Sequence, residues 1–248
     1  MFGLRPRLPV VEEERLWVNE GFERLKRLLG EQRMLACDVI QPTDDYFPDK
    51  YDGSEAAVLT MLRRVCGYMK VDPENLALNI MADSSELMEL GPAYSIRAGG
   101  PAGLHISEVG ENKSVICVRQ SLLKDPLTMV ATIAHELGHV ILLDGGLMSR
   151  DAEDMEPMTD LTTVFLGFGI FNANASLLFR KYRDERYEGW STNRLGYLPQ
   201  IVFGYALARF AWERGEINPS WVNHLSTNVR TYFQQSLRWL QKNSSQLI

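Results

Sequence analysis

The 248-residue sequence is poor in cysteine and in histidine. Its three cysteines, Cys37, Cys66 and Cys117, lie far apart and form no CxxC pair. This spacing argues against a disulfide framework and against a cysteine zinc site. We therefore expect free, buried thiols in a cytoplasmic protein. The four histidines are His105, His135, His139 and His224, and two of them lie four residues apart.

Basic residues are outnumbered by acidic ones. The sequence has 26 lysines and arginines against 32 aspartates and glutamates, which gives a formal net charge of −6. A nucleic-acid partner is therefore not expected. The N-terminal segment has two arginines but no apolar run, and it turns acidic at Glu12. We expect no signal peptide there.

Long uncharged runs are rare, and one stretch stands out. Residues 161–179 carry no charge, and this stretch is long enough to span a bilayer. It is followed by Arg180, Lys181 and Arg183, the kind of basic flank found at the cytoplasmic end of a membrane span. It also contains asparagines, threonines and glycines, which favour a buried helix. A buried helix is our expectation, and a membrane anchor is the alternative.

The remaining composition is that of a globular protein, with 45% hydrophobic and 23% charged residues. Hydrophobic periodicity and capping residues predict helices and short strands. The predicted helices cover residues 12–35, 55–69, 125–143, 157–185, 198–214 and 219–242. The predicted strands cover residues 77–81, 93–96, 104–109 and 114–119.

These elements predict an α+β fold with a small, mostly antiparallel sheet. We expect a single domain over residues 1–248. Within it, residues 1–70 form a helical N-terminal region, residues 71–180 an α+β core, and residues 181–248 a helical C-terminal region. The sequence has no evident linker or internal repeat, and it leaves the oligomeric state open.

The sequence His135-Glu136-Leu137-Gly138-His139 lies inside the predicted helix 125–143. Histidines four residues apart share a helix face, so both imidazoles can bind one zinc ion. Glu136 follows the first histidine and can reach a water beside the metal without being a ligand. Two histidines and a glutamate in so apolar a helix are costly to bury unless something satisfies them.

A catalytic zinc ion needs a third protein ligand. Neither His105 nor His224 lies at a known ligand spacing, and we assign them no metal role. The acidic segment 151–160 follows the helix and offers several carboxylates. From the residues alone, the candidates in this segment are Glu153, Asp154, Glu156 and Asp160.

His-Glu-x-x-His followed by Glu156-x-x-Thr-Asp160 resembles the gluzincin zinc metallopeptidases. The resemblance implies a zincin-like fold, with an active-site helix beside the sheet. It implies Glu156 as the third zinc ligand and Asp160 as the residue that holds a zinc histidine, His135. Residues four apart share a helix face, which is consistent with these two roles. Pro157 directly follows the implied ligand, so Glu156 is expected near a helix start.

Further roles follow only from the resemblance. A tyrosine or histidine of the C-terminal part is expected to stabilise the oxyanion, and the candidates are Tyr197, Tyr205 and His224. The strand 114–119 is expected to be the edge strand that pairs with substrate.

The predicted function is a zinc-dependent metallopeptidase that hydrolyses a peptide or protein substrate. Glu136 is expected to act as general base on a zinc-activated water. The alternative is a catalytically silent or regulated zincin-fold protein that works by binding. The sequence does not indicate the substrate, or whether cleavage is internal or terminal.

Overall fold

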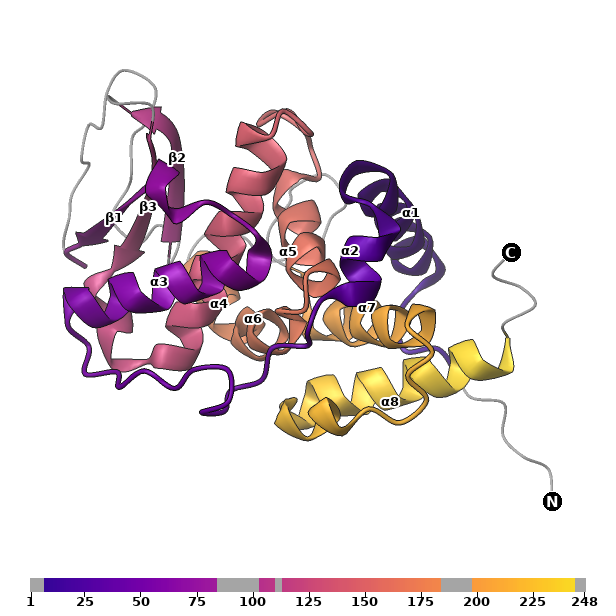
Figure 1. The fold of residues 1–248 in the computed structure, drawn as a ribbon. Coiled ribbons are helices and arrows are strands. Elements are labelled where there is room, and N and C mark those ends of the chain that lie inside the picture. Colours follow the sequence, from indigo (N-terminus) through magenta and orange to yellow (C-terminus); the bar gives the residue numbers. More distant parts are fainter. Residues whose placement is uncertain (1–6, 84–102, 110–112, 184–197, 244–248) are drawn as a thin grey trace. The chain divides into compact units, whose positions relative to one another are not determined.

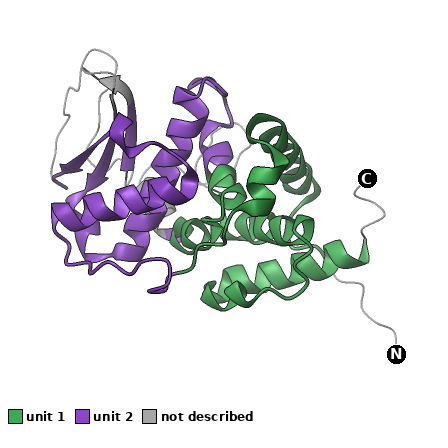
Figure 2. Ribbon diagram, viewed as in Figure 1, with its two compact units in different colours: residues 1–41, 160–176, 198–248 green, residues 42–159, 177–197 purple. Residues whose placement is uncertain are grey.

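The computed structural model describes residues 7–83, 103–109, 113–183 and 198–243. The protein is α+β and mostly helical, with one three-stranded mixed sheet among these residues (Figure 1). This confirms the predicted α+β class. The chain forms two compact units (Figure 2). Unit 1 contains the described parts of Met1–Gln41, Asp160–Ser176 and Leu198–Ile248, and unit 2 those of Pro42–Thr159 and Leu177–Tyr197. The single domain stays a prediction.

The sheet lies in unit 2 and has the strand order β1-β3-β2. β1 (Leu76–Met81) pairs in parallel with β3 (Lys113–Arg119), and β2 (Gly103–Val109) pairs antiparallel with β3. The described sheet is therefore mixed and not mostly antiparallel, and the predicted strand 93–96 lies outside the described residues. β3 is the central strand, so the expectation that it is an edge strand is wrong.

Two capped helices complete the frame of unit 2. α3 (Glu55–Met69) begins at Ser54, whose Oγ accepts a hydrogen bond from the backbone N–H of Ala57. α4 (Pro126–His139) begins at Asp125, whose Oδ1 accepts from the backbone N–H of Thr128. α4 packs against β2, β3 and α3, and it continues as a π-helical turn over Val140–Asp144. Short 3₁₀ turns over Pro73–Asn75 and Gln120–Lys124 adjoin the strands.

Unit 1 contains helices from both ends of the chain. They are α1 (Glu12–Leu29), α2 (Glu31–Ala36), α7 (Gln200–Glu213) and α8 (Thr227–Lys242). α7 packs against α1 and α8. The predicted helix 12–35 is broken at Gly30, whose φ of 88° is accessible to glycine but strained for other residues. The predicted helix 219–242 begins later, because Ser220–His224 forms a separate 3₁₀ turn.

The predicted helix 157–185 is also two helices, α5 (Met155–Phe165) and α6 (Gly169–Arg183). The break is at Gly167, which has a φ of 88°, and a Cβ there would overlap the carbonyl oxygen of Asp38. The carbonyl of Gly167 accepts from the backbone N–H of Ile40 at 2.9 Å. Most described side chains of the uncharged stretch are buried.

A different segment has the length and composition of a membrane span. Among the described residues, only Pro126–Asp144 meets both criteria, and most of this segment is buried inside the protein. A buried core helix meets the same criteria, so the finding is weak support for a membrane span.

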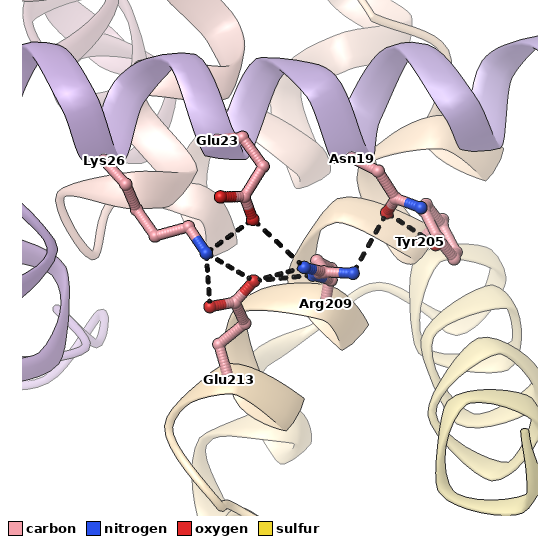
Figure 3. A network of polar contacts seen from close by, with 6 residues as sticks. All are labelled: Asn19, Glu23, Lys26, Tyr205, Arg209 and Glu213. Carbon is pink, nitrogen blue, oxygen red and sulfur yellow. Dashed lines mark hydrogen bonds and ion pairs between the residues drawn. The ribbon is translucent and has the colours of Figure 1, made fainter. Parts of the chain in front are cut away.

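A network of charged and polar side chains joins α1 to α7 in unit 1 (Figure 3). Glu213 accepts from Lys26 Nζ at 3.1 Å and from Arg209 Nη2 at 2.6 Å. The side chains of Arg209 and Glu213 are 7% and 8% exposed. Tyr205 donates its hydroxyl to Asn19 Oδ1 at 2.9 Å. The opposite charges allow this polar group to lie between two helices at low exposure.

Candidate metal centre

α4 carries His135, Glu136 and His139 on one buried segment of helix. All three residues are less than 9% exposed. The rings of His135 and His139 are one helical turn apart, with centroids separated by 4.9 Å. The predicted placement of both imidazoles on one helix face therefore agrees with the geometry.

The first turn of α5 brings Glu156 to these two histidines. Its Oε2 lies 3.1 Å from Nε2 of His135 and 3.5 Å from Nε2 of His139. One ligand atom from each of the three residues lies within 4.8 Å of the others. Within the described part of the chain, no other three histidine, cysteine or acidic residues form such a group. Of the acidic segment 151–160, Glu156 is the residue that joins the two histidines. The geometry of this group of three does not identify the metal.

The pKa values of the two carboxyl groups of the centre, Glu136 and Glu156, are shifted in opposite directions. Burial raises the pKa of Glu136, and the nearby His135 and His139 only partly offset this effect. Burial also acts to raise the pKa of Glu156, but the close contacts of its carboxylate with the two histidine rings together outweigh this effect and hold the pKa well below its usual value. Glu156 is therefore an anion suited to a cation, whereas Glu136 takes up a proton more readily.

Thr159 fixes the orientation of His139, a role that the sequence analysis missed. Its hydroxyl donates to the carbonyl of Met155 at 2.8 Å, and its Oγ1 lies 3.2 Å from Nδ1 of His139. Because the hydroxyl has a single proton, Nδ1–H of His139 donates to the threonine oxygen. Nε2 of His139 then carries the lone pair that a metal needs. Thr159 is three residues after Glu156, and this shared helix face was the available signal.

β2 approaches α4 closely at Gly103. A Cβ at this position would lie 2.5 Å from Oε1 of Glu136 and 2.5 Å from Cγ2 of Thr132. The backbone N–H of His105, two residues along β2, donates to the Glu136 carboxylate. The absence of a side chain at Gly103 therefore makes the space in which Glu136 is held.

A cavity of about 230 Å³ opens at this centre. It is lined by Gly103–His105 of β2, by His135, Glu136 and His139 of α4, and by Arg150, Ala152 and Glu153 of the α4–α5 connection. Glu156 and Glu136 line the same cavity. A molecule bound in the cavity would therefore contact both the group of His135, His139 and Glu156 and the buried carboxylate of Glu136.

His105 belongs to this cavity although the sequence analysis assigned it no role. Its Nε2 lies 3.0 Å from Oδ2 of Asp144, and Ser114 Oγ donates to the same oxygen at 2.5 Å. The His105 ring is stacked on that of His139, with centroids 6.2 Å apart and planes 9° apart. Burial lowers the pKa of His105 to about 4. The sequence carried no local signal for this placement, because it depends on β2 packing beside α4.

The other predicted residues, where the structure describes them, belong to unit 1. Asp160 is buried, and its Oδ2 accepts from the backbone N–H of Leu198 at 2.7 Å. Its role behind His135 stays a prediction. Tyr205 is fully buried in unit 1, and Tyr197 lies outside the described residues. The carbonyl of His224 accepts from Asn174 Nδ2 in unit 1.

Comparison with protein-family models, with curated proteins and with solved structures finds no match to the chain.

Proposed function

We propose that the protein is a zinc-dependent metallopeptidase of gluzincin type, with a zincin-like arrangement of α4 beside the sheet. The observation that carries the proposal is a division of roles among four side chains of one cavity. Two imidazoles and one carboxylate converge within 4.8 Å, and the fourth group, Glu136, lines the same cavity outside this triad. A purely structural metal site has no need of that fourth group.

The three converging side chains fit zinc. Two imidazole nitrogens and one carboxylate oxygen are a donor set that catalytic zinc sites use. The contact between Thr159 and His139 supports the fit, because it leaves Nε2 of His139 unprotonated. When bound, zinc would act as a Lewis acid that polarises a carbonyl and makes a water more acidic.

Glu136 is the proton carrier in the proposed reaction. Its carboxylate removes a proton from the water that attacks the peptide carbonyl. The same carboxyl then delivers that proton to the leaving amine nitrogen as the C–N bond breaks. Burial raises the pKa of Glu136, which makes the proton easier to hold between the two steps. The N–H of His105 and the space at Gly103 keep the carboxylate in place.

The substrate in this proposal is a peptide or an unstructured protein segment, in the cytoplasm. The cavity of about 230 Å³ is lined by a basic residue, Arg150, and an acidic residue, Glu153, so it favours no single charge class. We therefore expect activity on a mixed library of internally quenched peptides.

The test compares zinc-loaded wild-type protein with Glu136→Gln. The variant is expected to bind zinc as the wild type does and to lose at least about 100-fold in kcat, the lower range for a general acid–base group. Glu74→Gln, at an exposed residue of the same unit, is the matched control and should leave activity unchanged. Wild-type protein that holds zinc but cleaves no library peptide would favour the binding or regulatory alternative. Equal activity of the wild type and Glu136→Gln would refute the mechanism.

A further inference from the structure

A polar cluster adjoins the cavity through His105, and the proposed mechanism uses none of its side chains. It consists of His105 on β2, Asp144 at the end of the π-helical turn after α4, and Ser114 on β3. Oδ2 of Asp144 receives the Ser114 hydroxyl and lies 3.0 Å from Nε2 of His105. The cluster thus links the sheet to the end of the metal-binding helix.

These contacts determine which nitrogen of His105 carries the proton. A carboxylate only accepts hydrogen bonds, so Nε2 of His105 must be the protonated nitrogen of the pair. In a neutral imidazole, Nδ1 then carries a lone pair and acts as an acceptor. Nδ1 of His105 is buried and has no hydrogen-bond partner among the described residues. A buried acceptor without a donor is rare in proteins and points to a missing partner.

We propose that His105 is a substrate-binding residue whose Nδ1 accepts a hydrogen bond from a backbone N–H of the bound peptide. The inference rests on the proposed function. His105 lines the cavity, and its ring is stacked on that of His139, so the imidazole lies next to one of the proposed metal ligands. A peptide offers an N–H donor beside every carbonyl, and this donor is the complement of a lone imidazole acceptor. Asp144 and Ser114 act as positioning residues, because they fix the tautomer.

The direct test is the imidazole ¹⁵N spectrum of the zinc-loaded protein. The chain has only four histidines, so the loss of one signal set in His105→Gln assigns His105. We expect an Nε2–H tautomer with an unprotonated Nδ1. Benzyloxycarbonyl-leucine hydroxamate, which joins a zinc-binding group to a peptide-like N–H, should shift the Nδ1 resonance toward a hydrogen-bonded value. Acetohydroxamate has the same metal-binding group without that second N–H and should not.

Two outcomes would overturn the inference. A proton on Nδ1 in the free protein would show that the acceptor does not exist. An Nδ1 resonance that neither hydroxamate moves would show that a resident water, and not the peptide, is the partner.

Two variants separate binding from support of the metal centre. His105→Gln places an amide donor near the Nε2 position and removes the acceptor, whereas His105→Asn places an amide oxygen near the Nδ1 position. Affinity for benzyloxycarbonyl-leucine hydroxamate should fall about tenfold in His105→Gln, which is about 1.4 kcal/mol. It should fall less in His105→Asn, and zinc affinity should stay unchanged in both. Wild-type hydroxamate affinity in His105→Gln, or an equal loss of zinc affinity, would refute the assignment.

Failure of this inference is distinguishable from failure of the proposed function. If the protein binds no zinc, the proposed function fails, and the tautomer of His105 still tests its pairing with Asp144. If the protein binds zinc and Glu136→Gln is inactive, but the hydroxamate does not shift the Nδ1 resonance of His105, only the proposed role of His105 fails.

Discussion

Replacement of Gly103 by alanine tests whether β2 holds Glu136 in place. The added Cβ would lie 2.5 Å from both Oε1 of Glu136 and Cγ2 of Thr132, whereas ordinary contact begins at 3.4 Å. Each neighbour must therefore retreat by about 0.9 Å if the backbone stays in place. Glu136 and Thr132 are only 3% and 2% exposed, so neither can turn into solvent.

Two effects follow from this crowding. Overpacking should lower the free energy of unfolding by about 1–3 kcal/mol, which corresponds to a fall in Tm of roughly 2–12 °C. A displacement of about 1 Å at a reacting group should lower kcat about 100-fold. Zinc content should not change, because the three atoms nearest to the added Cβ belong to Glu136 and Thr132 and none belongs to His135, His139 or Glu156.

The assay measures thermal unfolding, zinc content and peptide-library hydrolysis for Gly103→Ala and a matched variant. Gly67→Ala is the control, because it lies exposed in α3 and a Cβ there meets nothing within 4 Å. The control should gain up to about 1 kcal/mol of stability from the better helix propensity of alanine. Wild-type stability and activity in Gly103→Ala would refute the close approach of β2 to Glu136.

Two further predictions concern other contacts. Thr159→Val removes the oxygen that accepts the hydrogen bond from Nδ1–H of His139, and it should weaken zinc binding about 10- to 100-fold in a chelator competition. Thr159→Ser keeps the oxygen and should retain most of the zinc affinity. Wild-type zinc affinity in Thr159→Val would contradict the assigned tautomer of His139. Glu213→Ala removes an anion that pairs with Lys26 and Arg209 but leaves Glu23 paired with both, and urea unfolding should show a loss of about 1–3 kcal/mol in the free energy of unfolding. The control is Glu20→Gln at an exposed position of α1, which should change the free energy of unfolding by less than about 0.5 kcal/mol. If Glu213→Ala loses no more stability than this control, the network does not stabilise the protein.

Local patterns in the sequence predicted well the helix that carries the candidate metal ligands. The start of α4 follows from Asp125 and Pro126, whose capping and φ preferences act within one turn. The shared face of His135 and His139 follows from helical periodicity alone. Glu156 required a motif in addition, because the distance between α4 and α5 depends on the connection between them.

The missed features depend on contacts between distant segments. The sequence pattern predicted the ends of β1, β2 and β3 to within one residue, but it did not predict the parallel pairing of β1 with β3. The helix break at Gly167 depends on the approach of the Asp38 backbone, more than a hundred residues earlier in the chain. His105 enters the cavity only because β2 lies beside α4. Single-sequence patterns carry no information on these approaches.

The central claim is that His135, His139 and Glu156 hold one zinc ion. Titration of zinc into the metal-free protein tests it most directly, with Glu156→Ala and Glu153→Ala compared against the wild type. Glu153 lies three residues earlier in the same acidic segment and is exposed in the structure. We predict one tightly bound zinc per chain in the wild type and in Glu153→Ala. In Glu156→Ala, affinity should fall by more than about 100-fold, since even residues behind the ligands cost 10- to 100-fold. No stoichiometric zinc in the wild type, or an equal loss in the two variants, would contradict the account.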